Sequence, residues 1–325
     1  HTTPTAMLRS LVGSEMCIRD RDYTVNNKEV FHLKYPYKSG ITKPLTNLLH
    51  STSKYLRDNF EFSKNPLAID IGSNAIRLLI SNVIRLDGKL HHTKNSLHRV
   101  PVRLGQDSFL NSKITDSSKD KLINTIRSFK FLMEANEIDD YLAYATSAMR
   151  NASNGQEILD NIFEETKIKI EIISGKKESE IVASNDITEH IGNSPNYCFI
   201  DVGGGSTEVI IYKNHKLHKS KSFKIGGVRL LNDLVEEKSW NEFKFWLLEN
   251  ASEIKKIKLV GIGGNINKIF KLSGNKYGKP LSISKFKSTL KKLKKTSAKK
   301  MLIDLKLNPD RIDVIPVSYT HLRAH

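Results

Sequence analysis

The sequence has few cysteines and no long apolar segment. Cys17 and Cys198 are the only cysteines among 325 residues, which excludes a disulfide framework and a cysteine-rich metal cluster and fits a reducing compartment. No apolar run approaches the ~20 residues that a membrane-spanning helix needs, and the N-terminus lacks the apolar segment of a signal peptide. We therefore expect a cytoplasmic protein.

Acidic residues are scarce relative to basic ones. The chain has 52 Lys and Arg against 35 Asp and Glu, a net charge of +17. This surplus favours polyanionic partners such as polyphosphate, nucleotides, nucleic acid or acidic membranes. Solvated lysines explain it equally well, because Lys recognises its partners with little specificity. For the lysine-rich run at residues 291–295, on an expected helix over 284–300, a solvated face is favoured over a surface that guides a polyanion.

The two ends of the chain contain no periodic pattern. Residues 1–21 and 317–325 resemble translated sequencing-adapter read-through, so we leave them out of the fold prediction. Residues 22–65 are rich in Lys, Asn, Tyr and Ser, and within them residues 52–61 alone could form a short helix. We therefore treat residues 1–65 as a foreign or poorly structured segment without an assigned role.

The stretch YCFIDVGGGSTEVIIY at residues 197–212 organises the rest of the chain. It predicts a strand, a glycine turn with φ > 0 at Gly203, Gly204 and Gly205, and a second strand. Backbone N–H groups in such a turn point one way and can bind an anion such as phosphate. Asp201 and Glu208 place carboxylates beside the turn, where a divalent cation could bridge protein and phosphate. A plain glycine hairpin explains this stretch taken alone nearly as well.

A second stretch, LAIDIGSNAIRLLI at residues 67–80, repeats the same order of apolar run, Asp, Gly and polar turn. A third glycine loop, residues 261–265, follows another short apolar run. Two hairpins of the form Asp-x-Gly indicate an internal duplication, with two lobes facing each other and phosphate loops lining the cleft. A chance pair of plain hairpins explains the repeat much less well.

From residue 67 the pattern predicts two strings of elements in the order β-β-β-α-β-α, and hence an α/β fold with sheets of mixed direction flanked by helices. The first string comprises strands at 67–71, 75–84 and 89–104, a helix at 115–135, a strand at 141–146, a loop at 147–151, a helix at 156–166, a strand at 168–173 and a helix at 178–191. After a boundary at 192–195, the second comprises strands at 197–202, 207–212 and 214–225, helices at 226–236 and 240–254, a strand at 258–262, a helix at 265–272 and a last strand at 313–315. The apolar stripe of the 115–135 helix is expected in the core: Leu122, Ile123, Ile126, Phe129 and Met133.

Five short motifs occur in an order that resembles the Ppx/GppA phosphatases, which are exopolyphosphatases and guanosine pentaphosphate phosphohydrolases. They are DIGSN at 70–74, ATSAMR at 145–150, ISGKKE at 173–178, the stretch 201–208 and the loop 261–265. The resemblance covers residues 66–316. It implies duplicated domains of the actin/Hsp70/sugar-kinase (ribonuclease H-like) fold, with a cleft between a first lobe at 66–191 and a second at 197–316.

The resemblance also implies roles for individual residues. Glu178 matches the general base that activates water, and the dipole of its expected helix would help keep it charged. Arg150 matches an arginine that clamps phosphate through its planar fork. Without the resemblance, Glu178 would be an ordinary acid at a helix start and Arg150 a surface ion-pair partner. The remaining matches are acids near a magnesium ion and the water (Asp70, Asp201, Glu208) and phosphate loops (Ser73, Asn74, Gly203, Gly204, Gly205, Ser206, Gly263, Gly264).

The sequence departs from the family pattern in two places. Lys176 and Lys177 stand where the family usually has more acids, and Glu180 stands where it often has an arginine, so we expect altered substrate contacts. The family also continues past residues 313–315 into a further helix and a glycine-containing segment. We therefore expect a C-terminally truncated fragment, with an incomplete second lobe and a foreign tail at 317–325.

These features predict Mg²⁺-dependent hydrolysis of the terminal phosphoanhydride bond of polyphosphate, guanosine pentaphosphate or both. Two alternatives stay open: an ATP-dependent kinase of the same fold, and a non-catalytic sensor that binds polyphosphate or a nucleotide. The expected partners are these phosphate polyanions, without specific nucleic acid or membrane. A homodimer stays open as the assembly.

Overall fold

A computed structural model describes residues 66–86, 89–183, 194–276 and 279–318. All helices and strands below belong to the larger of the two compact units into which the chain divides. The expected N-terminal segment 1–65, the end of the predicted helix 178–191 and residues 319–325 of the predicted tail lie outside the described residues. No helix in the described ranges has both the length and the apolar character needed to cross a membrane.

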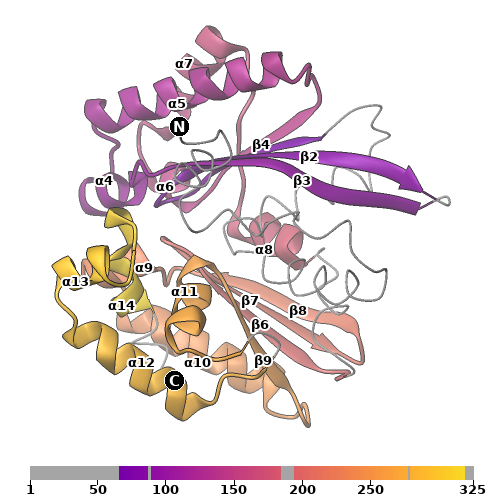
Figure 1. The fold of residues 1–325 in the computed structure, drawn as a ribbon, viewed down its shortest axis with the longest axis vertical. Coiled ribbons are helices and arrows are strands. Elements are labelled where there is room, and N and C mark those ends of the chain that lie inside the picture. Colours follow the sequence, from indigo (N-terminus) through magenta and orange to yellow (C-terminus); the bar gives the residue numbers. More distant parts are fainter. Residues whose placement is uncertain (1–65, 87–88, 184–193, 277–278, 319–325) are drawn as a thin grey trace, which may run out of the picture. The chain divides into compact units, whose positions relative to one another are not determined.

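The first sheet has five strands in the order β3-β2-β1-β4-β5 (Figure 1). The central strand β1 is buried along its whole length, which explains its nearly continuous apolar sequence. It pairs antiparallel with β2 and parallel with β4, so the prediction of a mixed sheet is confirmed. The strands are β1 (Leu67–Ile71), β2 (Ile76–Leu86), β3 (Lys89–Val100), β4 (Tyr141–Ala145) and β5 (Glu171–Ile172).

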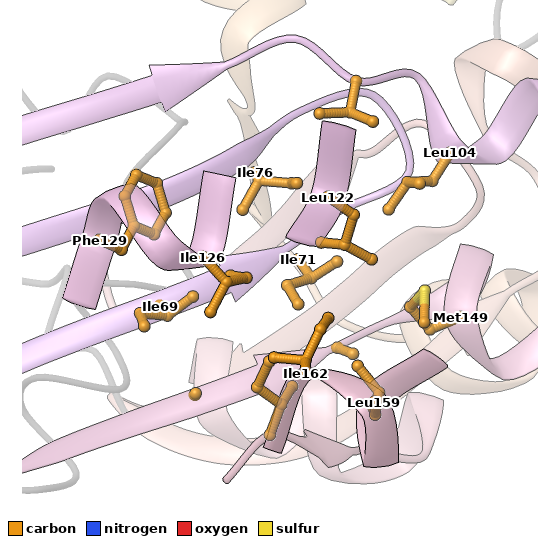
Figure 2. Close-up of a cluster of buried hydrophobic side chains, with 14 of the residues drawn as sticks. Ile69, Ile71, Ile76, Leu104, Leu122, Ile126, Phe129, Met149, Leu159 and Ile162 are labelled. Carbon is orange, nitrogen blue, oxygen red and sulfur yellow. The ribbon is translucent and has the colours of Figure 1, made fainter. Parts of the chain in front are cut away.

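Helices α5 (Asp116–Ala135) and α7 (Gly155–Thr166) cover one face of this sheet (Figure 1). Helix α5 begins where predicted, because the Thr115 hydroxyl accepts the backbone N–H of Ser118 as an N-cap. Its predicted apolar stripe lies in the core against Ile69 and Ile71 (Figure 2). The same half contains three shorter helices, α4 (Leu104–Asn111), α6 (Ser147–Asn151) and α8 (Gly175–Ala183).

The second sheet repeats the arrangement of the first four strands. Its order is β8-β7-β6-β9, and β6 pairs antiparallel with β7 and parallel with β9. Helix α8 follows the first sheet along the chain, yet Val182 and Ala183 pack in a cluster with Tyr197 and Phe199 of the second sheet. The strands are β6 (Tyr197–Val202), β7 (Thr207–Lys213), β8 (Lys216–Phe223) and β9 (Lys258–Ile262).

The second half contains more helices than strands. Helix α10 packs its Phe243 against Phe223 of β8 with ring centroids 5.1 Å apart, and Leu290 and Leu293 bury one side of the lysine-rich helix α12. The helices are α9 (Gly227–Leu231), α10 (Glu237–Ala251), α11 (Gly264–Leu272), α12 (Ile283–Lys295), α13 (Ala298–Ile303), the 3₁₀ turn Pro309–Arg311 and α14 (Val314–Ser318).

Several local predictions are wrong. The extended segment expected up to residue 104 ends at Val100, because Arg103 adopts a left-handed conformation (φ 60°) and α4 begins directly after it. The loop expected at 147–151 is helix α6. The last strand expected at 313–315 belongs instead to helix α14, which begins at Val314, since a short apolar run has the same sequence signature in either state. β5 and α9 are shorter than predicted, and α14 includes Val317 and Ser318 of the expected foreign tail.

Candidate active site

The hairpin turns of both sheets line one pocket. The β1–β2 turn, the β6–β7 turn and the loop between β9 and α11 all line it, together with Glu178 of α8. Arg150 does not line the pocket but contacts Glu178 from α6. The pocket therefore brings together all but one of the residues that the sequence singled out: Asp70, Ser73, Asn74, Glu178, Asp201, Gly203, Gly204, Gly205, Ser206, Glu208, Gly263 and Gly264.

The two hairpin turns touch each other, and this contact explains Gly204 and Gly205. A Cβ on Gly205 would overlap the hydroxyl of Ser147 and the ring of Phe109, and a Cβ on Gly204 would lie 3.0 Å from Cβ of Ser73. The expectation that Gly203, Gly204 and Gly205 need φ > 0 is wrong, since none of them has a positive φ. Gly204 and Gly205 are small so that their turn can approach the β1–β2 turn and its neighbours closely, whereas a Cβ on Gly203 would meet only the carbonyl of Ser206 in its own turn.

Gly263 is the site glycine that does have a positive φ. Its φ is 113°, a region that L side chains rarely adopt, and a Cβ there would lie 2.6 Å from Oδ1 of Asp201. Gly263 therefore lets the β9–α11 loop pass directly beside the Asp201 carboxylate.

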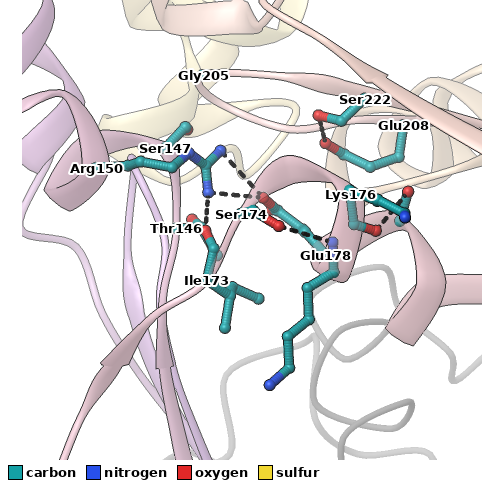
Figure 3. Close-up of polar contacts among 12 residues, drawn as sticks. Thr146, Ser147, Arg150, Ile173, Ser174, Lys176, Glu178, Gly205, Glu208 and Ser222 are labelled. Atoms are coloured by element: carbon teal, nitrogen blue, oxygen red, sulfur yellow. Dashed lines mark hydrogen bonds and ion pairs between the residues drawn. The ribbon is translucent and has the colours of Figure 1, made fainter.

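Glu178 lies in the first turn of α8 and faces Arg150 (Figure 3). Nη2 of Arg150 is 3.4 Å from Oε2 of Glu178, and Nη1 donates to the carbonyl of Ile173, which holds the guanidinium in place. The hydroxyl of Ser174 accepts the backbone N–H of Lys177 at 3.1 Å and so caps the start of the helix. The local sequence ISGKKE thus forms the helix start that presents the carboxylate.

The Glu178 carboxyl is buried and lies near other acids. Burial is the largest cause that raises the pKa of Glu178 well above its usual value, and the nearby Glu208 and Asp70 raise it further, while Arg150 opposes them. Burial also raises the pKa of Glu208, opposed by hydrogen bonds from Ser206 and Ser222 and by the charge of Arg150. Four carboxylates therefore line one pocket, and burial disfavours the ionisation of three of them, Glu178, Glu208 and Asp70.

The third carboxylate, Asp70, has a direct partner. Burial raises its pKa, but Nη1 of Arg77 donates to its Oδ2 at 2.6 Å and opposes that shift. Asp70 and Arg77 also lie opposite each other in the β1–β2 register. In the β6–β7 register the residue opposite Asp201 is Glu208, so this pair brings two acids together.

The donor set fits a magnesium ion that is held partly by its substrate. Within the described ranges, no group of three or more His, Cys, Asp or Glu side chains is arranged to hold a metal. Mg²⁺ is commonly bound by one or two carboxylates together with water and substrate phosphates. Asp201 and Glu208 supply such a pair of hard oxygen donors, whereas Asp70 is engaged by Arg77.

The sequence analysis missed three arginines that line the pocket: Arg77, Arg99 and Arg311. Arg77 is the one charge within the apolar run 75–80, and that isolation could have pointed to it. Arg99 has no such signal. It contacts Asp310, whose Oδ2 also accepts Nδ2 of Asn74 at 2.9 Å, a pairing between residues 236 positions apart in the chain.

The sequence profile of the Ppx/GppA phosphatase family matches residues 87–320, more than half of the chain. The chain belongs to this family. As a Ppx/GppA family member it is 29% identical over 274 residues to a bifunctional 3-dehydroquinate synthase/phosphatase of Fusobacterium nucleatum, covering 75% of this chain and 41% of that protein. It is 28% identical over 169 residues to exopolyphosphatase 1 of Mycobacterium tuberculosis, covering 52% of this chain and 48% of the relative.

The predicted fold class is confirmed by solved structures. A crystal structure of an exopolyphosphatase from Cytophaga hutchinsonii matches with a TM-score of 0.65 and 22% identity, over 80% of this chain and 89% of that one. At this identity the match shows the fold alone. The chain spans less than half the length of the two curated relatives named above.

Proposed function

We propose that this protein hydrolyses the terminal phosphoanhydride bond of a phosphate polyanion, either polyphosphate or guanosine pentaphosphate. The observation that carries the proposal is the buried Glu178 facing Arg150 at a pocket lined by two facing hairpin turns. The family membership supports the same reaction class. The substrates come from the family name and from the exopolyphosphatase among the relatives.

The turns bind the terminal phosphoryl group in this mechanism. Backbone N–H groups of the Gly203–Ser206 turn and the hydroxyls of Ser73 and Ser206 are suited to donate to phosphate oxygens. Arg150 adds a planar fork with a fixed positive charge, which is suited to an oxygen of the same group. Donors held in place by buried loops need little rearrangement when charge moves during the reaction.

Glu178 acts as the general base. Its carboxylate takes a proton from the attacking water as the water oxygen bonds to the terminal phosphorus, and the bond from phosphorus to the bridging oxygen breaks in line. The products are orthophosphate and the polyanion shortened by one phosphate. Burial moves the pKa of Glu178 upward, in the direction of the working pH at which a general base is most effective.

Asp201 and Glu208 would hold Mg²⁺, which when bound would neutralise charge on the substrate phosphates. Without the cation, the Glu208 carboxylate would repel both Glu178 and the incoming polyanion. The hydroxyl of Ser222 donates to Oε1 of Glu208 at 2.9 Å and so fixes the orientation of the proposed metal-binding carboxylate. A cytoplasmic location belongs to the same proposal.

The test measures orthophosphate release from polyphosphate and from guanosine pentaphosphate, each with Mg²⁺ and with EDTA. Mg²⁺-dependent release from at least one substrate is expected. A kinase would instead transfer phosphate from ATP to an added acceptor hydroxyl, and a sensor would bind the polyanion without releasing phosphate. Either of these results would contradict the proposal.

A further inference from the structure

Arg229 is a buried arginine that the proposed reaction does not use. It belongs to α9 and is 8% exposed, yet no carboxylate among the described residues pairs with it. Burial and the charge of the nearby Arg150 both lower its pKa. Burying a cation without an acidic partner costs free energy. The other contacts of Arg229 must therefore offset that cost.

Those contacts join three separate elements. Nε of Arg229 donates to the carbonyl of Gly205 at 2.9 Å, and Nη2 donates to Oδ1 of Asn151 at 3.1 Å. The guanidinium carbon lies 3.9 Å from the ring centroid of Phe109, which places the cation on the face of the ring. One side chain from the second half therefore holds the β6–β7 turn to α4 and α6 of the first half.

The contact with Gly205 orients the next peptide group. In a trans peptide the carbonyl oxygen and the following N–H point in opposite directions. Because Arg229 holds the carbonyl of Gly205, the N–H of Ser206 faces away from Arg229. Ser206 lines the pocket, so this orientation bears on a phosphate donor of the turn.

The contact with Asn151 connects Arg229 to the helix that carries Arg150. Asn151 directly follows Arg150 on the short helix α6, whose residues Ser147, Ala148 and Met149 are buried in the first half. Arg229 thus links the turn that would bind a phosphate oxygen to the helix that carries the guanidinium fork. A change of about 1 Å in such a relation can cost roughly 100-fold in rate.

We propose that Arg229 is a positioning residue for the phosphate site: it orients the Gly205–Ser206 peptide and holds it in a fixed relation to Arg150. Arg229 also adds a positive charge that an anion bound to the turn would offset. This inference rests on the proposed function for its substrate. The positioning role of Arg229 requires only that the β6–β7 turn binds a phosphate anion.

The test compares Arg229→Ala and Arg229→Lys with Arg127→Gln, a matched control on α5 whose arginine pairs with Glu165 away from the pocket. The first readout is the rise in melting temperature caused by inorganic phosphate in EDTA, which involves no turnover. We expect Arg229→Ala to lose most of this rise, Arg229→Lys to keep part of it, and the control to keep all of it. Lysine retains the charge but cannot reach both acceptors with a planar fork.

The second readout is steady-state kinetics on the substrate that the wild type hydrolyses. Loss of one positioned donor costs about 10²–10³-fold in comparable sites, so we expect a fall in kcat/KM of that order for Arg229→Ala, with KM raised as well as kcat lowered. Added guanidinium should restore part of the activity of Arg229→Ala. If Arg229→Ala does not fold, Arg229→Lys decides on the same readouts.

The outcomes separate this inference from the proposed function. Variants that melt at a lower temperature but keep the full phosphate-induced rise and an unchanged kcat/KM would show a purely structural arginine and overturn the inference. A wild type that phosphate does not stabilise would overturn it as well. A wild type that releases no phosphate from any substrate, yet is stabilised by phosphate through Arg229, would contradict the proposed function and leave the inference standing.

Discussion

The two hairpins that repeat in this chain differ in the residue that faces the aspartate. Asp70 on β1 lies opposite Arg77 on β2, and their side chains form an ion pair at 2.6 Å. Asp201 on β6 lies opposite Glu208 on β7 at the same place in the register. Arg77 offsets the charge of the first carboxylate, and the second pair places two acids opposite each other, an arrangement that a cation would stabilise.

The duplicated fold therefore places two chemically different turns in one pocket. The β1–β2 turn is electrically balanced and contributes the polar groups of Ser73 and Asn74. The β6–β7 turn supplies closely approaching glycines and the two acids suited to a cation. We infer that the first turn mainly shapes the phosphate site and that the second mainly controls its charge.

The largest effect is expected at Glu178, whose ionisation is opposed by acids of both hairpins. Glu178→Gln keeps the shape of the side chain but cannot accept a proton from water, and loss of a general base costs about 10²–10⁴ in rate. We expect kcat to fall by this factor while the affinity for substrate stays nearly the same. Kinetics at saturating substrate measure the effect.

The control for this variant is Glu180→Gln on the same helix. The Glu180 side chain is 54% exposed and interacts with Lys176, so its change should leave kcat within a factor of about two. Loss of the general base should leave about a hundredth of the wild-type kcat or less. If Glu178→Gln retains more than roughly a tenth, Glu178 is not the base.

Glu208→Gln and Asp70→Asn test the charge difference between the hairpins directly. Removing the Glu208 charge should raise the Mg²⁺ concentration for half-maximal activity by about 10–100-fold, the usual range for a disturbed metal site. Asp70→Asn should change this concentration much less, because Arg77 already engages that carboxylate. Magnesium titrations at fixed substrate make the comparison. Equal shifts in the two variants would show that both hairpins hold the cation.

Arg150→Lys should lower kcat/KM by about tenfold, or ~1.4 kcal/mol, close to the strength of one charge-assisted hydrogen bond. Lysine keeps the positive charge but loses the planar fork that reaches both Glu178 and the carbonyl of Ile173. The matched control is Arg127→Lys on α5. An unchanged kcat/KM in Arg150→Lys would place Arg150 outside the reaction.

The pH dependence of stability offers a smaller effect. Because the pKa of Glu178 is raised in the folded state, the folded protein binds this proton more tightly than the unfolded chain does. The resulting stability is fully present below the unfolded pKa of ~4.3 and is lost as pH rises through the folded pKa. Glutamine does not titrate, so Glu178→Gln should melt at a higher temperature than wild type near neutral pH.

Thermal melts in EDTA at a mildly alkaline and an acidic pH measure this difference. We expect the advantage of Glu178→Gln to be largest at the alkaline pH and to shrink toward zero as the pH falls to about 4, where the wild-type carboxyl is protonated in both states. Glu180→Gln serves again as control. If Glu178→Gln raises the melting temperature equally at both pH values, ionisation of Glu178 does not lower the stability of the folded protein.

The smallest expected difference concerns backbone protection in the two halves. The first sheet is supported by one large cluster of buried side chains and two small ones, whereas the second sheet contacts three clusters of intermediate size and none as large. β4 has β5 as an outer neighbour, while β9 has none within the described ranges, and Leu259 on β9 is 71% exposed. We expect faster amide hydrogen exchange in residues 197–316 than in 67–191, most clearly in β9 relative to β4. Equal protection of both halves would contradict this comparison.

Local patterns in the sequence predicted the parts of the fold that depend on neighbouring residues. The apolar runs before Asp70 and Asp201 predicted β1 and β6, because a buried strand needs a short, nearly continuous apolar segment. The helical spacing from Leu122 to Met133 predicted α5 together with its buried face. The Asp-x-Gly turns were found for the same reason, since the turn and both strands lie within a few residues of each other.

The tertiary structure decided the features that depend on distant residues. Gly204 and Gly205 of the β6–β7 turn proved to be needed for contact with Ser73 and Ser147, which no local rule on turn conformation could indicate. The contacts of Arg229 with Asn151 and of Asp310 with Asn74 join residues 78 and 236 positions apart. Hydrophobic periodicity and turn chemistry act over a few residues, whereas these contacts exist because two folded sheets bring their turns together.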